Sequence, residues 1–420
     1  MIHLLALLGL AVLGLIIRSF ALIDISSSAA YGMGMIMLIG YCAGQVFRKL
    51  GIPSITGYLV AGMAIGPFGM ELITRAHVED LTLINGLALS LIALTAGGEI
   101  RISRLRPHLK TITWVLVMQT VTMVTGMTAG FWFLATRIPN LTISTQTGIL
   151  AAGLLIGVVS TASSPSTTLA VIVESGRRSV TTDLILGIVM LKDIVILFLF
   201  CIGLNVAQAL TSASSGNPSG LGNTFFQISG SVIVGVLIGV IIIAFLKYIK
   251  SQQVIFILAI CFFTYEIFEP LKLHPLLIMM SAGFLVVNLS REGDRLMDHL
   301  EEISPPVYVL FFTLAGAALR LDLLKTLGLT AMILVILRIA CKWAGTWLGL
   351  RTSGTMPYLR HRGWTAFVSQ AGLSLGLATI IADQFPGWGD SIALLILSAI
   401  FINQLIGPLT LKWLLDRDGK

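Results

Sequence analysis

Charged side chains are scarce in this sequence of 420 residues. Asp, Glu, Lys and Arg make up 11% of it, against about 25% in a soluble protein, and hydrophobic residues make up 56%. Polar stretches long enough to fold as a separate soluble domain are also lacking, because the longest polar connectors are 211–223 and 291–302. These absences exclude a soluble protein and predict an all-α polytopic membrane protein with a single membrane domain over residues 1–420.

Features of enzymes and of metal proteins are missing as well. The four cysteines all fall inside apolar segments and share no CxxC spacing, so they indicate neither a disulfide nor a metal site. No Gly-rich phosphate motif occurs, and no span contains a nucleophile–base pair or a cluster of metal ligands. The net charge of +7 does not indicate a nucleic-acid partner, because the basic residues lie in short loops between apolar spans. We therefore expect neither an enzyme nor a bound cofactor.

Long apolar runs are abundant instead. Windows of about 20 residues, the length that spans a bilayer, predict fourteen transmembrane helices. Their expected ranges are 2–22, 30–48, 54–72, 80–99, 110–135, 146–173, 181–208, 224–248, 253–269, 274–290, 304–319, 324–350, 361–383 and 389–415. The first range has no basic region before it and no small-residue cleavage site after it, so we interpret it as a retained helix rather than a signal peptide.

The basic residues predict the orientation of these helices. Of the 27 Lys and Arg residues, three lie within spans. If the N-terminus is cytoplasmic, eighteen of the others face the cytoplasm and six face the opposite side, which satisfies the positive-inside rule. We therefore predict a multi-pass protein of the cell membrane, in the bacterial inner membrane, with both termini in the cytoplasm.

The spans divide into two sets of six. An extra N-terminal helix (1–22) precedes the first set (30–208), and a linker helix (224–248) separates it from the second set (253–415). A single connecting span gives the two sets opposite orientations, as an inverted repeat requires. We therefore expect a 6+6 inverted repeat.

The fifth helix of each set is interrupted by small polar residues. The interruptions are Ser160–Ser166 and Ser369–Gly376. Paired interruptions at matching positions indicate a binding site near the bilayer midplane between two broken helices. Ordinary packing of Gly and Ser between helices is the alternative. Pro165 disfavours that alternative for the first interruption, because proline lacks a backbone donor and frees a carbonyl at membrane depth.

Two adjacent charges, Lys192 and Asp193, lie at the middle of the apolar run Leu184–Leu204. Each charge at a helix centre costs roughly 2.5 to 3.5 kcal/mol on insertion scales, so a functional site is the default interpretation and a structural ion pair the alternative. Asp193 is the only acid near the middle of any span. A buried carboxylate can hold either a proton or a metal cation, and competition between the two is enough for exchange.

Oxygen ligands for a dehydrated Na⁺ or K⁺ are expected beside this carboxylate. They are the hydroxyls and freed carbonyls of the first broken helix, at Thr161, Ser163 and Ser164.

Several motifs follow one another in the order of a known transporter family. They are GIPSITGYLVAGMAIGP at 51–67, ALTAGGEIR at 93–101, the Ser160–Ser166 interruption, Glu174-Ser-Gly-Arg177, Asp193, Lys342-Trp-Ala-Gly345 and the Ser369–Gly376 interruption. From about residue 30 to 415 the chain resembles the second family of monovalent cation:proton antiporters. That family includes bacterial Na⁺/H⁺ antiporters and the membrane domain of glutathione-gated potassium efflux systems.

The resemblance implies a homodimer that exchanges Na⁺ or K⁺ for protons by alternating access, with a scaffold of outer helices and a moving six-helix core. The two broken helices would cross in that core beside Asp193, which would bind proton and cation in turn. Lys342 would be the basic partner that pairs with acidic groups, and Arg338, one turn earlier on the same face, would share or replace that role. The second broken helix would contribute Ser369, Gln370 and Gly372.

Two features depart from the family pattern. Lys192 stands where the family usually has Asn, Asp or Gln, which places a second cation beside the proposed cation site. It either points away from Asp193, about 100° around the helix, toward another partner, or titrates itself. The chain also stops five residues after the last span, so we expect no C-terminal nucleotide-binding regulatory domain.

Two other functions stay open at this point. A passive cation channel or uniporter on the same fold would move cations without protons. A Na⁺-coupled organic-anion symporter would suit the excess of intramembrane positive charge, because Lys192, Arg338 and Lys342 face a single Asp.

Overall fold

The computed structural model describes residues 29–417, except 136–142, 144, 178, 212–219, 250–251, 269, 272, 319–320, 355–356, 371–372 and 386. Within these residues the chain forms α-helices, short 3₁₀ helices and turns, and no β-strand occurs there. The predicted all-α class is therefore confirmed. The predicted extra helix at 1–22 lies outside the described residues.

The chain packs as two compact units. The first comprises the described residues within Met1–Ile102, Leu169–Glu174 and Gln227–Asp322. Its elements are α2 (Ala29–Lys49), α3 (Ser54–Ile65), α4 (Arg75–Asp80), α5 (Thr82–Glu99), most of α11 (Gly220–Tyr248), α12 (Gln253–Phe268), α13 (Pro275–Leu289) and α14 (Gly293–Ala317). Here α2 packs against α3, α3 against α14, and α5 against α13.

The α5–α13 contact illustrates how these helices pack. A Cβ atom added to Gly97 would lie 2.0 Å from the carbonyl oxygen of Met280, and one added to Gly283 would lie 2.1 Å from that of Leu94. Two backbones therefore touch where no side chain fits. Small residues allow this approach, and the resulting van der Waals contact holds helices together in lipid, where burial of apolar groups brings little gain.

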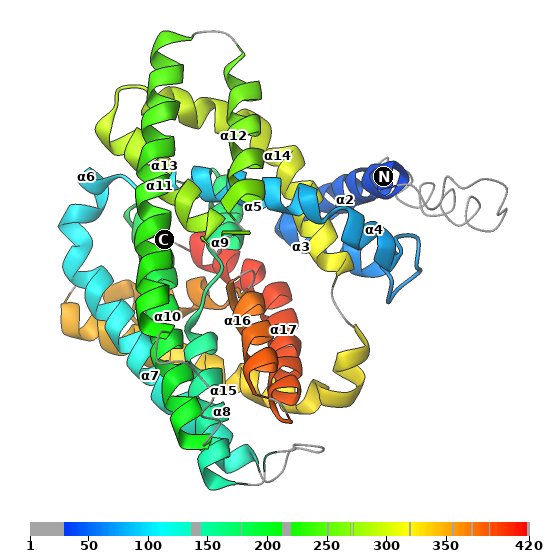
Figure 1. Cartoon of the computed structure of the whole chain (residues 1–420), viewed down its shortest axis with the longest axis vertical. Coiled ribbons are helices and arrows are strands. Elements are labelled where there is room, and N and C mark those ends of the chain that lie inside the picture. Colours follow the sequence, from blue (N-terminus) through cyan, green and yellow to red (C-terminus); the bar gives the residue numbers. More distant parts are fainter. Residues whose placement is uncertain are drawn as a thin grey trace, which may run out of the picture. The chain divides into compact units, whose positions relative to one another are not determined.

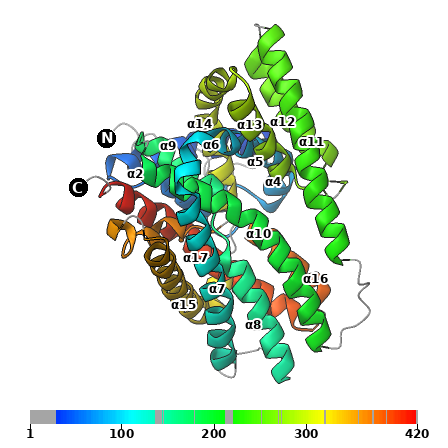
Figure 2. The same ribbon diagram turned by 90° about the vertical axis from the view of Figure 1, so that its left-hand side faces the viewer.

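The second unit comprises the described residues within Ser103–Thr168, Ser175–Phe226 and Leu323–Lys420. Its elements are α6 (Ile102–Leu105), η2 (Arg106–His108), α7 (Leu109–Ala135), α8 (Gln146–Thr161), the start of α9 (Pro165–Ser175), α10 (Val180–Thr211), α15 (Leu321–Ser353), η3 (Pro357–Leu359), η4 (Gly363–Phe367), α16 (Leu373–Gln384) and α17 (Gly389–Leu415). Both views show α8 beside α7 and α10, and α16 beside α17 (Figures 1 and 2). Their core contains Met123, Phe131, Leu155, Ile196, Leu377 and Ile396.

The described residues contain seven helices that are long and apolar enough to cross a bilayer, judged by length and composition. Five shorter apolar helices accompany them: Ser54–Ile65, Gly86–Glu99, Gln253–Phe268, Pro275–Leu289 and Leu373–Ala382. One side of α11 exposes the large apolar residues Val232, Ile233, Val236, Leu237, Val240 and Ile241. A continuous apolar stripe of this kind fits contact with lipid rather than with water.

Two predicted ranges need correction. The span expected at 304–319 is the second half of α14, which begins at Gly293, so most of the predicted polar connector 291–302 is helical. The apolar window missed this part because only one face of the helix is buried. Pro305 and Pro306 lie inside the helix, where proline supplies no backbone N–H to the carbonyls one turn earlier, which belong to the exposed residues Glu301 and Glu302.

The helix expected at 54–72 ends earlier than predicted. Helix α3 stops at Ile65, and residues 66–74 form turns. Pro67 follows two residues after the last helical residue, where it cannot supply the backbone donor that a longer helix needs.

Candidate functional site

The first interruption is a true helix break in the second unit. Helix α8 ends at Thr161, and α9 begins at Pro165 after three non-helical residues. Proline is favoured at a first helical position because its missing N–H has no partner there. The Oγ of Ser164 accepts a hydrogen bond from the backbone N–H of Thr167 (3.2 Å) and so caps the new helix. The local sequence therefore starts a second helix within a single apolar span.

The second interruption, predicted at Ser369–Gly376, is non-helical at its start and helical from Leu373 on. The 3₁₀ helix η4 ends at Phe367, residues 368–370 are irregular, and α16 begins at Leu373. The predicted site residue Gly372 lies outside the described residues. The predicted range 361–383 is thus a short 3₁₀ helix and an α-helix separated by a break.

The two breaks contact each other directly. The backbone N–H of Ser164 donates to the carbonyl of Ser369 (3.0 Å), and Ser163 Oγ donates to the carbonyl of Phe367 (3.1 Å). The side chain of Gln370 donates to the carbonyl of Val159 (3.0 Å), in the last turn of α8. The two interruptions, more than 200 residues apart in the chain, therefore form one polar centre.

Arg338 on α15 connects the two breaks. Its guanidinium is buried and donates from Nε to the carbonyl of Ser160 (2.9 Å), from Nη2 to that of Ala162 (2.6 Å) and from Nη1 to that of Val368 (2.7 Å). Backbone carbonyls buried without a donor are costly in a membrane, and arginine offers five donors in a rigid planar group. One side chain thus satisfies carbonyls of both broken helices.

Lys342, one turn further along α15, binds the same region. Its buried Nζ donates to the carbonyls of Thr161 (2.7 Å) and Ala162 (3.2 Å) and to Ser163 Oγ (2.9 Å). No salt bridge within 4 Å joins it to Asp193 in the described part of the chain. Its contacts are carbonyls and a hydroxyl rather than the carboxylate that the family resemblance implied.

These contacts change the expected ligand set. The sequence suggested that the freed carbonyls near Thr161 bind the cation. The carbonyls of residues 159–162 already accept hydrogen bonds from Gln370, Arg338 and Lys342. A cation about 4 Å from a fixed positive charge meets a repulsion of about 4 kcal/mol at an effective dielectric constant of 20. A cation is therefore disfavoured at these carbonyls and favoured at carboxylate and hydroxyl oxygens.

Lys192 points toward α7 and has three contacts. Its buried Nζ donates to Gln119 Oε1 (2.5 Å) and to Ser163 Oγ (3.5 Å), and it lies 4.6 Å from the centre of the Phe367 ring. Sequence reasoning missed Gln119. The signal was present, because Gln119 is a lone amide at the middle of an apolar span.

One carboxylate oxygen of Asp193 is unpaired among the described residues. Its Oδ1 is buried and has no hydrogen-bond partner among the described residues. Buried polar atoms are almost always paired, so an unpaired carboxylate oxygen suggests a place for a species absent from the protein itself. A proton or a monovalent cation has the right charge for that place.

The remaining predicted hydroxyls differ in acceptor capacity. Thr161 Oγ1 donates to the carbonyl of Gly157 (3.0 Å), which leaves its lone pairs available. Ser164 Oγ donates to Thr167 Oγ1 (3.0 Å), accepts from the backbone N–H of Thr167 (3.2 Å) and lies 3.0 Å from Ser166 Oγ, so its lone pairs are occupied. Each hydroxyl oxygen carries two lone pairs. In the described residues no three His, Cys, Asp or Glu side chains converge on a common metal site.

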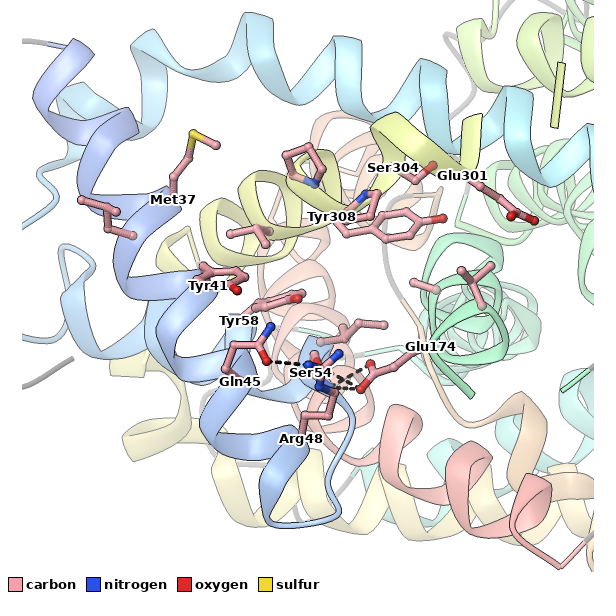
Figure 3. A pocket seen from close by; sticks show the side chains of 17 residues that line it. Met37, Tyr41, Gln45, Arg48, Ser54, Tyr58, Glu174, Glu301, Ser304 and Tyr308 are labelled. Atoms are coloured by element: carbon pink, nitrogen blue, oxygen red, sulfur yellow. Dashed lines mark hydrogen bonds between the residues drawn. The ribbon is translucent and has the colours of Figure 1, made fainter. Parts of the chain in front are cut away.

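The first unit contains a separate cavity of about 480 Å³. It lies among α2, α3, α14 and the part of α9 that belongs to this unit, and Tyr41, Tyr58 and Tyr308 line it (Figure 3). Glu174 closes one side by accepting three hydrogen bonds from Ser54, two from the backbone N–H (2.8 and 2.9 Å) and one from Oγ (2.8 Å). A carboxylate at the first residue of α3 stabilises the helix N-terminus, so Glu174 has a structural role there.

Comparisons with known proteins agree with this architecture. Residues 34–417 match the model of the family described as "Sodium/hydrogen exchanger, transmembrane". The chain is 22% identical over 394 residues to "Probable Na(+)/H(+) antiporter 3" of Methanocaldococcus jannaschii, covering 91% of this chain and 95% of that protein. Two structures of the sodium proton antiporter MjNhaP1 from the same organism are each 18% identical in sequence to the present chain.

The structural match extends over most of both proteins. The MjNhaP1 structure at pH 8 has a TM-score of 0.67 and covers 91% of this chain and 95% of its own. The electron-microscopy structure has a TM-score of 0.72, with coverage of 91% and 94%. At this identity the likeness shows the fold, whereas the family match spans most of the sequence. The chain belongs to the sodium/hydrogen exchanger family.

Proposed function

We propose that this member of the family, a monovalent cation/proton antiporter, carries its two substrates in turn on the carboxylate of Asp193. The buried Oδ1 of Asp193 without a partner is the observation that carries the proposal. A single carboxylate oxygen can hold a proton or a cation but not both. Competition between them, exposed to one side of the membrane at a time, couples the two fluxes.

The surrounding groups divide their roles by charge. Arg338 and Lys342 hold the broken helices together through carbonyls. The cation therefore need not neutralise those carbonyls, and its ligands are Asp193 with the hydroxyl of Thr161. Lys192 adjoins Asp193 in the chain, and its Nζ is held on the side of α7.

The finer architecture is part of the same proposal. Each predicted set of six helices has a broken fifth member, α8–α9 in the first and η4–α16 in the second, with α11 between the sets. This arrangement supports a 6+6 inverted repeat. We further propose a homodimer in which the unit holding both breaks moves during alternating access.

Sodium is the first candidate for the carried cation, because the relative is named a probable Na⁺/H⁺ antiporter and MjNhaP1 a sodium proton antiporter. Potassium is the second. Passive cation flux and organic-anion symport, the two other functions considered from the sequence, lack comparable support. Exchange measured separately with Na⁺, K⁺ and Li⁺ identifies the ion.

Substitution of Asp193 tests the proposal. Purified Asp193→Asn is reconstituted in proteoliposomes with an internal pH dye. Its cation-dependent proton movement is expected to fall to the level of empty liposomes, because an amide has neither the negative charge that binds a cation nor a group that takes up and releases a proton. The variant should still elute from size-exclusion chromatography as the wild type does.

A matched control lies on the same helix. Asp183 is in the first turn of α10, and Asp183→Asn should exchange at a rate similar to that of the wild type. Normal exchange by Asp193→Asn would refute the proposed role of Asp193.

A further inference from the structure

Gln119 is a buried residue of α7 whose side chain connects Lys192 on α10 with Thr346 on α15. Its Oε1 accepts from Lys192 Nζ (2.5 Å), and its Nε2 donates to Thr346 Oγ1 (2.7 Å) on α15. The proposed function uses neither Gln119 nor Thr346.

The hydrogen-bond network determines which way the amide faces. The hydroxyl of Thr346 donates its only proton to the backbone carbonyl of Lys342 (2.7 Å), one turn earlier on α15. Thr346 Oγ1 can therefore only accept from Gln119, which requires the NH₂ group of the amide at that position. The oxygen of the amide must then face Lys192. Gln119 thus offers Lys192 an acceptor, and the reverse orientation would place two donors against each other.

The backbone around Gln119 leaves the side chain little freedom. A Cβ added to Gly345 would lie 2.6 Å from the Cα of Gln119 and 3.0 Å from its backbone nitrogen. Helices α7 and α15 therefore touch at this residue. An amide anchored at both ends, on a backbone that cannot shift, is a rigid support.

Lys192 has few other acceptors. Ser163 Oγ lies 3.5 Å away and already accepts from Lys342 at 2.9 Å. The other charged groups near Lys192 are the basic residues Arg338 and Lys342 and the neighbouring acid Asp193. The strongest alternative acceptor for a Lys192 ammonium released from Gln119 is therefore the carboxylate of the next residue.

We propose that Gln119 is a positioning residue that draws the Lys192 ammonium to the α7 side of α10 and so leaves Asp193 Oδ1 vacant. The two side chains leave α10 about 100° apart, but the four-carbon stem of lysine lets its head swing toward the carboxylate when no acceptor holds it. The inference rests on the proposed function, in which Asp193 binds the cation. Gln119 acts on that step through Lys192 and does not touch the cation.

Gln119→Leu removes the acceptor with little change in volume. In proteoliposomes the variant should raise the KM for Na⁺ about tenfold, the order expected when a cation must displace a charged partner, while the maximal rate at saturating Na⁺ stays close to that of the wild type. Gln119→Glu keeps an acceptor oxygen for Lys192, and the Thr346 hydroxyl can rotate its proton from the Lys342 carbonyl to the new carboxylate, so this variant should restore a KM close to the wild-type value.

A double-mutant cycle shows whether the effect passes through Lys192. With Lys192→Met as background, adding Gln119→Leu should leave the KM unchanged, because no ammonium remains to be positioned. Gln253→Leu is the matched control: it removes a buried amide of the first unit that contacts His299, and it should lower thermal stability without changing the KM.

The possible failures are distinguishable. No exchange by the wild type would refute the proposed function itself. Exchange by the wild type, with a Gln119→Leu effect that is confined to the maximal rate or that adds fully to Lys192→Met, would overturn the role of Gln119 and leave the proposed function standing.

Discussion

Among the described residues of the polar centre, three buried basic side chains and one carboxylate are ionisable, and the basic groups are held mainly by uncharged oxygens. Arg338 and Lys342 bind backbone carbonyls, and Lys192 binds an amide oxygen. A positive charge in a membrane protein is retained only where such partners compensate its loss of hydration. The breaks in the helices supply these carbonyls. The breaks and the basic residues therefore depend on each other.

This dependence predicts a large effect of Arg338→Gln. The shorter side chain cannot reach the carbonyls of Ser160 and Val368 together, and each buried carbonyl left without a donor costs about 1–3 kcal/mol. Thermal unfolding in detergent, followed by size-exclusion chromatography, should show a clear loss of stability. Exchange should be lost as well.

Arg351→Gln is the control on the same helix. Arg351 is exposed and lies 4.9 Å from the centre of the Trp347 ring, a contact with an expected value of about 0.5–1 kcal/mol. Equal melting temperatures for the Arg338 and Arg351 variants would contradict the carbonyl-binding role of Arg338.

At the scale of the elements, the contact between the two breaks needs close backbone packing. The second break lies against α17, where a Cβ added to Gly407 would be 2.4 Å from the Cα of Ser369. The overlapping atoms belong to the backbone, which cannot move aside as a flexible side chain can. Gly407 is therefore a position on α17 where backbone contact holds the second break in place.

Gly407→Ala is expected to displace the second break and to reduce the exchange rate strongly, while the protein still inserts into the membrane. The same change at Gly376, on α16, meets no atom within 4 Å and should leave exchange unaffected, with a stability gain of about 0.5–1 kcal/mol from the loss of glycine. The proteoliposome assay compares the two variants. Similar rates for both would show that the Gly407 contact is not needed.

At the scale of the whole molecule, the chain crosses repeatedly between two units. The short segment Leu169–Glu174 and the much longer segment Gln227–Asp322 belong to the first unit although their neighbours in the chain belong to the second. Apolar windows detect each helix separately and carry no information on this division. The number of membrane spans is still predicted from the apolar windows of the sequence, and the side of the membrane on which the chain ends from the Lys and Arg residues of the loops.

The loop charges predict that both termini lie in the cytoplasm. A green fluorescent protein fused to either terminus should fluoresce in a bacterial host, and an alkaline phosphatase fused to the C-terminus should be inactive, because each reporter works on one side of the membrane only. An active phosphatase at the C-terminus would mean an odd number of spans after a cytoplasmic start.

Most helices could be predicted from the sequence because a span of about 20 apolar residues is a local property. The prediction failed where burial is one-sided, at the start of α14, and where proline ends a helix early, after α3. The approximate positions of both helix breaks could also be predicted, because Pro165 and the small polar residues disfavour helical hydrogen bonding at their own positions in the chain. The roles of the site residues stay predictions until the variants are measured.

The sequence by itself determined that the protein spans a membrane, that two apolar helices are interrupted, and that Lys192, Asp193, Arg338 and Lys342 are charges at membrane depth. Only the tertiary structure decided their partners. Hydrogen bonds form over a few ångströms between residues up to 211 positions apart, so no local pattern shows that Arg338 and Lys342 occupy the freed carbonyls or that Gln119 takes Lys192. Asp193 Oδ1, in contrast, has no hydrogen-bond partner among the described residues.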